Sequence, residues 1–148
     1  MARVNYYDIQ NEIKEILELD QTLAGINIQI EEPTRFQHGG YVIIHLDRRE
    51  APDEDQFIDA GQSTRFDVFF NVVCIQTSMS SLASAMRARD DLMGKVEVAL
   101  MKVRDLNNKA SVQWLGGGPF ESGQIEGMKG SAAQGTIEML VKVTGTTT

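Results

Sequence analysis

Residues 64–77, TRFDVFFNVVCIQT, decide the fold of this chain. Apolar and polar residues alternate through most of this stretch, which is typical of a β-strand with one buried face. The residues that share the apolar face are Phe66, Val68, Phe70, Val72 and Cys74. Such a strand would span about 46 Å at roughly 3.3 Å per residue. It would be much longer than the usual strand, which has about five or six residues. We therefore expect a central strand that projects in part beyond the body of the domain.

The remaining elements are read outward from this strand. A helix is expected over Asn5–Leu19, with Asn5 as its N-cap, because isoleucine and leucine recur there at helical spacing. A second, longer helix is expected to begin at Ser78 or Ser80 and to reach about Leu106. Alternating apolar residues predict the other strands over 26–30, 41–49, 110–115 and 134–144.

These elements predict a single α+β domain over residues 1–148, in the order αβββαββ. Two helices would pack on one face of a mainly antiparallel sheet of about five strands. The strand over 41–49 would pair with the central strand to form a long β-arm. The other face of the sheet is expected to be substantially polar, and a barrel-like sheet wrapped on a helix is the alternative.

Composition limits what the chain can bind. The 148 residues include 21 acidic and 14 basic ones, for a formal charge of −7. General nucleic-acid binding requires a basic surface, so this balance argues against it. Cys74 is the only cysteine and lies in an apolar run, where a free thiol behaves as a small hydrophobic group. No stretch approaches the roughly 20 apolar residues of a membrane span, so we expect a cytosolic setting or a particle assembled there.

Two long connections stand out between the predicted elements. The segment 116–133 is rich in glycine and is expected to be an irregular loop that binds a partner or is ordered by one. The segment 50–63 is acidic, and it reads either as a solvated turn or as a docking patch for a basic surface. Its candidate interface residues are Asp53, Glu54, Asp55, Phe57 and Ile58.

Other candidate interface residues lie on the second helix and in the glycine-rich segment. Arg89 falls within the apolar stripe of the helix, where it either snorkels to water or pairs with a carboxylate of its own or another subunit. Gly94 lies on the opposite face and costs up to about 1 kcal/mol relative to alanine. Phe120 is expected to anchor into a neighbouring subunit, and Gly117 and Met128 share its segment.

The chain offers no recognisable catalytic, cofactor or metal motif. Gly116-Gly117-Gly118 lacks the spacing and the following helix of a dinucleotide site, and the acidic loop fails the calcium-loop pattern. His38 and His45 have no partners at metal-ligand spacing. We therefore expect no enzymatic activity, no cofactor and no metal.

The layout resembles the tail terminator and tail-completion proteins of long-tailed bacteriophages. The resemblance covers most of the chain: the first helix, the strand RFDVFFNVVCIQT, the helix SSLASAMRARDDLMGKVEVAL, the strand ASVQWL, the glycine-rich loop and the strand GTIEMLVKVT. It implies a homohexameric ring in the virion, assembled in the host cytoplasm, that caps the tail tube. The partners implied are the tail tube protein, the neck or head-completion protein and, in contractile tails, the sheath. DNA would only pass through the lumen.

Other functions stay open on the sequence. One is another neck, connector or tail tube protein. A different class is a small α+β enzyme or ligand-binding domain, and a third is an adaptor that docks through residues 53–58.

Overall fold

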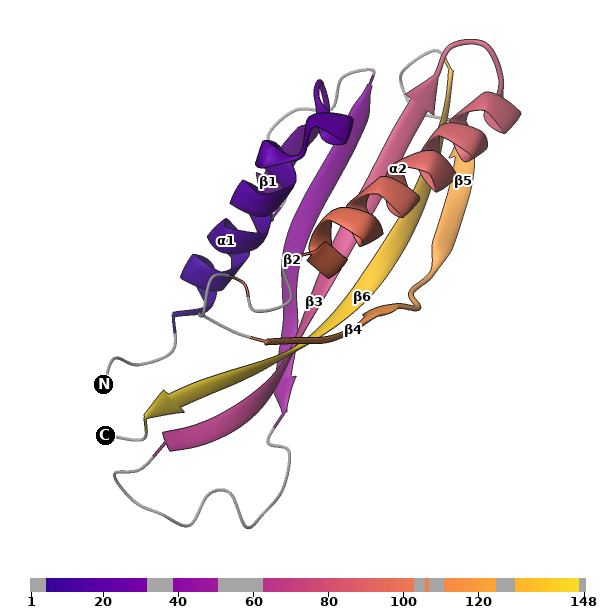
Figure 1. The fold of residues 1–148 in the computed structure, drawn as a ribbon. Helices are drawn as coiled ribbons and strands as arrows, with labels where there is room; N and C mark the ends of the chain where they lie inside the picture. The colour runs from indigo at the N-terminus through magenta and orange to yellow at the C-terminus, as the bar shows by residue number, and fades with distance from the viewer. Residues whose placement is uncertain are drawn as a thin grey trace.

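The computed structural model describes residues 5–31, 39–50, 63–102, 106, 111–124 and 130–146. The α+β class is confirmed, with one strand more than expected (Figure 1). The elements are α1 (Tyr6–Leu19), the 3-10 turn η1 (Gln21–Leu23), β1 (Asn27–Ile30), β2 (Gly40–Glu50), β3 (Ser63–Ser78), α2 (Leu82–Lys102), β4 (Ser111–Gly116), β5 (Phe120–Gln124) and β6 (Ser131–Thr146).

Side-chain caps fix where both helices begin. The Asn5 side chain accepts a hydrogen bond from the backbone N–H of Asp8 at 3.2 Å, which confirms the predicted N-cap of α1. The hydroxyl of Ser81 accepts from the N–H of Ser84 at 3.0 Å, so α2 begins after Ser81 and not at Ser78 or Ser80. With 21 residues, α2 is about 32 Å long at 1.5 Å per residue, shorter than the sequence suggested.

The strands form one open, mixed sheet. In the described residues its order is β1-β2-β3-β6-β4, and β5 also pairs with β6. The pair β1–β2 is parallel, and all other pairs are antiparallel. Since β1 and β4 are the two ends of this order, the barrel-like alternative is not realised.

The β-arm has three strands, where the sequence predicted two. β3 and β6 pair along their full 16 residues, from Ser63–Thr146 to Ser78–Ser131, and β2 pairs on the other side of β3. The lower ends of β2, β3 and β6 extend beyond the two helices (Figure 1). A bulge between Leu46 and Arg48 shifts the register of β2 on its way into the arm. The C-terminal strand itself was predicted, but its place in the arm was not, because sequence alone does not show which strands pair.

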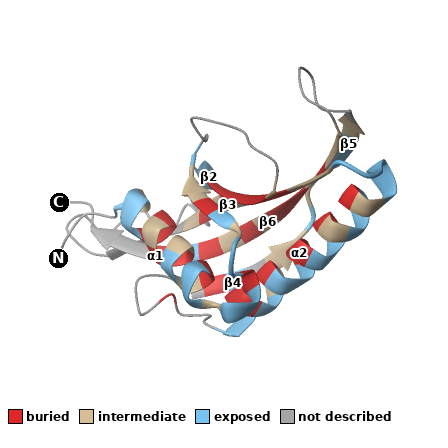
Figure 2. Cartoon of the chain, turned by 90° about the horizontal axis from the view of Figure 1, so that it is seen from above, coloured by how far each residue is buried: buried red, intermediate tan, exposed pale blue. Residues whose placement is uncertain are grey.

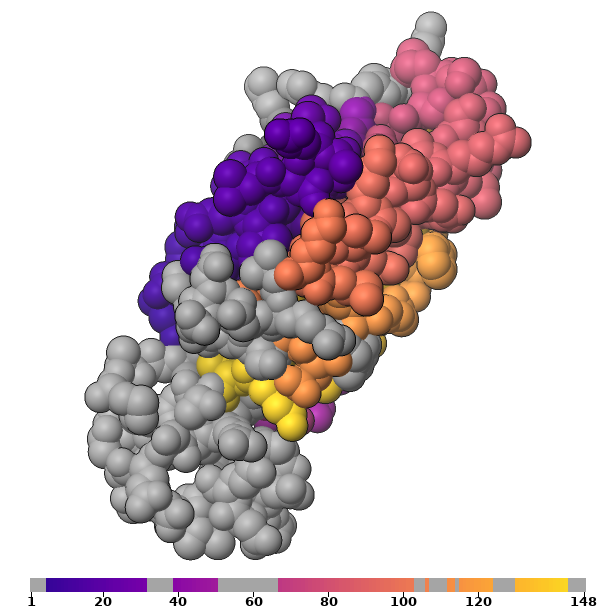
Figure 3. Space-filling view, viewed as in Figure 1, coloured from indigo at the N-terminus to yellow at the C-terminus, as the bar shows by residue number. Residues whose placement is uncertain are grey.

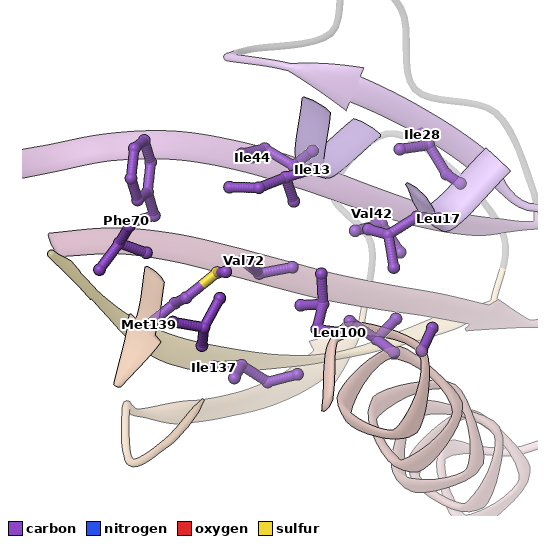
Figure 4. Close-up of a cluster of buried hydrophobic side chains, with 14 of the residues drawn as sticks. Ile13, Leu17, Ile28, Val42, Ile44, Phe70, Val72, Leu100, Ile137 and Met139 are labelled. Carbon is purple, nitrogen blue, oxygen red and sulfur yellow. The ribbon is translucent and has the colours of Figure 1, made fainter. Parts of the chain in front are cut away.

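Both helices cover the same face of the sheet, as predicted. α1 packs on β1 and β2, and α2 packs on β3 and β6. Buried residues line the sides where helices and sheet meet (Figure 2). The side chains at the centre are wholly buried (Figure 4): Ile13 and Leu17 from α1, Val42 and Ile44 from β2, Phe70 and Val72 from β3, Leu100 from α2, and Ile137 and Met139 from β6.

The far face of the sheet is less polar than expected. Tyr41 and Ile43 of β2 pair with Ile75 and Val73 of β3, and all four side chains are buried in a second, smaller cluster. β2 and β3 lie centrally in the sheet and carry apolar residues on both faces there. The polar far face predicted from the sequence is therefore wrong for this region.

Candidate assembly surface

The predicted interface residues fall into two groups. Three of them, Arg89, Gly117 and Phe120, lie among the described residues. The acidic-loop candidates Asp53, Glu54, Asp55, Phe57 and Ile58, together with Met128, lie outside the described residues.

The three consecutive glycines form a turn that leads directly from β4 into β5. Gly116, Gly117 and Gly118 all have positive φ, at 134°, 76° and 93°, which favours glycine at each position. A Cβ on Gly118 would lie 2.2 Å from the carbonyl oxygen of Thr136 on β6, so the backbone there passes too close for a side chain. Thr136 also donates its N–H to the carbonyl oxygen of Pro119 at 3.1 Å.

The prediction that residues 116–133 form one irregular loop is therefore wrong. Phe120–Gln124 is β5, which pairs with the start of β6. β4 and β5 follow one another along the same edge of β6, and the glycines make the step between them. Its described residues, 116–124 and 130–133, are placed largely by pairing within their own subunit, whereas the sequence suggested that the segment waits for a partner.

Arg89 is buried and pairs within its own chain. Only 7% of the residue is exposed, and its Nε and Nη2 atoms both lie 3.0 Å from Oδ1 of Asp90. Its guanidinium carbon lies 4.9 Å from the centre of the Phe120 ring, a cation–π contact between α2 and β5. Of the readings left open by the sequence, pairing with a carboxylate of the same subunit is confirmed.

Phe120 remains 60% exposed although it contacts Arg89. Three further large apolar side chains are also exposed: Met79, between β3 and α2, and Leu82 and Met86, at the beginning of α2. We call these four residues the α2/β5 flank. Aromatic and methionine side chains are common in binding surfaces, because one is large and rigid and the other adapts its shape. The sequence pointed to Phe120 but missed the methionines, which resemble ordinary core residues of a helix.

His45, which the sequence analysis considered as a metal ligand, takes part in a hydrogen-bond network. Its Nδ1 lies 2.9 Å from Oε2 of Glu31. The other oxygen of Glu31 accepts hydrogen bonds from the side chain of Gln10 at 2.8 Å and from the N–H of Leu46 at 3.2 Å. Burial alone would raise the pKa of Glu31, but these hydrogen bonds outweigh it and lower the pKa below its usual value.

A hollow of about 440 Å³ lies between η1 and α2, with Gly94 in its lining. Its charged groups are largely engaged with one another or with the backbone. Asp90 binds Arg89, and Lys95 lies 2.8 Å from Asp91.

The remaining reactive groups are buried or scattered. Burial, with a smaller contribution from Glu97, raises the pKa of Cys74 to about 12, so its thiol stays protonated at neutral pH. Within the described residues, histidine, cysteine and carboxylate side chains nowhere gather as a metal site would require. None of the helices described is both long and apolar enough to span a membrane.

No protein-family model matches the chain, and no curated protein matches it by sequence. Among solved structures, it is similar to a chain from the virion of a native gene transfer agent particle. The TM-score is 0.39 and the identity 14%, over 90% of this chain and 93% of that one. A likeness of this size says nothing about activity or partners.

Proposed function

We propose that this chain is a structural subunit of a phage-like virion, and more specifically a tail terminator. Copies would form a homohexameric ring that caps the tail tube and joins it to the neck or head-completion proteins. In a contractile tail the ring would also meet the sheath. The protein would assemble in the host cytoplasm and act without catalysis or cofactor.

The observation that carries this proposal is the α2/β5 flank. It places an aromatic ring and three exposed apolar side chains on one side of an ordered body. Exposed apolar surface is costly in water unless a partner covers it, so this flank supports an assembly role. The order of helices and strands in the sequence, which resembles that of tail terminators, supports the particular role.

The β-arm supports the same reading. Its strands β3 and β6 are 16 residues each and reach past the helical layer (Figure 1). A projecting arm of this kind presents main-chain edges and side chains to neighbours beyond the subunit's own core. In the proposed ring it would contact the tube or the next neck protein.

Two measurements test the proposal. Native mass spectrometry and electron microscopy of the purified protein should show closed rings, or rings on the ends of purified tail tubes. Wild-type protein that neither forms rings nor caps tubes would refute it. Open-ended filaments would instead identify a tube protein, which is the alternative structural role.

A further inference from the structure

The outer edge of β5 is open. Among the described strands β5 pairs only with β6, and it is the outermost strand beside α2 (Figure 1). In the space-filling view β5 (light orange) lies at the margin of the molecule next to α2 (Figure 3). Phe120, Glu121 and Ser122 are all exposed there. Proteins usually protect such an edge, because its unpaired main-chain groups can accept a further strand.

The pairing of β5 with β6 shows which main-chain groups are free. Residues opposite one another in an antiparallel pair alternate between those that exchange hydrogen bonds and those that do not. Continuing the register of β5 and β6 places Pro119 opposite Thr136, whose N–H donates to the Pro119 carbonyl oxygen at 3.1 Å. The next residue of β5 that hydrogen-bonds with β6 is therefore Glu121. The N–H and C=O groups of Phe120 and Ser122 point away from β6, toward the open edge.

The side chains beside this edge are apolar on one face of the sheet and acidic on the other. Phe120 lies on the helical face, where its ring contacts Arg89 of α2. Ser122 lies on the same face, because residues two apart along a strand point to the same side. The rest of the α2/β5 flank adds exposed apolar surface on that face. Glu121 points to the far face and has no ion pair among the described residues.

We infer that the open edge of β5 binds an extended segment of another protein, which joins the sheet as a further antiparallel strand. Main-chain hydrogen bonds to Phe120 and Ser122 would supply affinity, and alternate side chains would supply specificity. The residues opposite Phe120 and Ser122 would be apolar, since they project toward the α2/β5 flank. The residue between them would be lysine or arginine, because it lies opposite Glu121 and opposite charges favour a cross-strand pair. The inference rests on the proposed function, in that the partner would be a neighbouring virion protein.

The other open end of the sheet does not match this edge. That end is β1, in which Ile28 and Ile30 lie on either side of Gln29. Ile28 is already buried in the core of its own subunit, and Gln29 offers no cation to Glu121. Joining β1 of one copy to β5 of the next would therefore leave the charge of Glu121 uncompensated. The occupant that fits the edge is a different protein, and the experiments distinguish it from a second copy.

Peptides with selectively blocked main chains test the strand addition. The probe is a short fluorescein-labelled peptide of alternating valine and lysine, and fluorescence polarisation measures its binding to the full chain. N-methyl groups on the valines remove the donors that face β5, so this peptide should bind at least about tenfold more weakly. N-methyl groups on the lysines face solvent and should leave the affinity nearly unchanged. Both methylated peptides carry the same charge, so non-specific attraction to a chain of net charge −7 cannot separate them.

Substitutions in β5 test the same edge from the side of the protein. Ser122→Pro removes an N–H that points away from β6, so it should keep the fold, as circular dichroism can confirm, and weaken peptide binding at least about tenfold. Ser122→Ala keeps this N–H and is the matched control, which should bind as wild type does. Glu121→Lys should reverse the charge preference, from the valine–lysine peptide to a valine–glutamate peptide. This last variant changes an exposed side chain and decides the matter even if Ser122→Pro does not fold.

The outcomes separate this inference from the proposed function. Strand addition at β5 is wrong if no peptide binds, if the lysine-methylated peptide binds no better than the valine-methylated one, or if Glu121→Lys still prefers lysine. If a folded Ser122→Pro variant fails to form rings by itself, the occupant is a second copy and the assignment to another protein is wrong. Ring formation and tube capping by wild-type protein are measured without peptide, so they decide the proposed function independently.

Discussion

Replacing Gly94 by alanine should stabilise this protein. Gly94 lies inside α2, and a Cβ built on it meets no atom within 4 Å. The φ angle of Gly94 does not lie in the left-handed region, so alanine can adopt the same backbone conformation. Alanine restricts the unfolded chain more than glycine does and loses nothing in the helix, which is worth about 0.5–1 kcal/mol. For a chain of this size the gain corresponds to a melting temperature higher by roughly 1–4 °C.

The matched control is the same substitution at Gly118, where the sign should reverse. Its φ of +93° is strained for alanine, and the new Cβ would lie 2.2 Å from the carbonyl oxygen of Thr136. Backbone strain alone costs about 1–3 kcal/mol. Urea unfolding followed by circular dichroism measures both variants, and Gly94→Ala should shift the midpoint without changing the slope. A destabilised Gly94→Ala, or a Gly118→Ala as stable as wild type, would refute this reading of the two backbones.

Three further predictions follow from burial and charge. Phe70→Ala should lower the free energy of unfolding, measured by urea unfolding, by about 3–5 kcal/mol, because removing the wholly buried ring leaves a cavity. A loss below about 1 kcal/mol would contradict the position of Phe70 at the centre of the core. The folded pKa of Glu31 lies below its unfolded value of 4.5, so its charged form stabilises the fold above that pH and the contribution is lost as the pH falls through the folded pKa. The stability advantage of wild type over Glu31→Gln should therefore shrink in acid; an advantage that is constant with pH would refute the assignment. Cys74, with its pKa raised to about 12, should react with a thiol-specific disulfide reagent only after unfolding, and rapid reaction of the native protein would show that it is accessible.

Sequence periodicity located most elements within a few residues. The alternation in β3 and the stripe in α1 depend on local spacing, which the burial of one face enforces. Asn5 could be identified as a cap because its chemistry acts within one helical turn. What periodicity could not supply is pairing between distant segments, and so the third strand of the arm and the parallel pairing of β1 were not predicted.

β5 was missed for a different reason. Its sequence, FESGQ, contains a glycine and a glutamate and little that favours a strand. It is a strand because the positive-φ glycines before it hold the backbone against β6 and because β6 offers an unpaired edge there. The glycine-rich composition thus predicted an irregular loop where pairing with β6 in fact forms a strand. The exposed methionines of the α2/β5 flank were harder still to predict, since Met79 and Met86 differ from core methionines only in exposure.

The contact between Arg89 and Phe120 changes what the proposed assembly requires. The sequence suggested a loop that becomes ordered on docking, at an entropic cost repaid by the interface. In the structure the ring of Phe120 is already placed, on a strand paired with β6 and beside a guanidinium that Asp90 holds. An anchor that is ordered beforehand loses less conformational freedom on binding, so more of the apolar burial appears as affinity. In the proposed assembly, the α2/β5 flank should therefore dock largely as a rigid body.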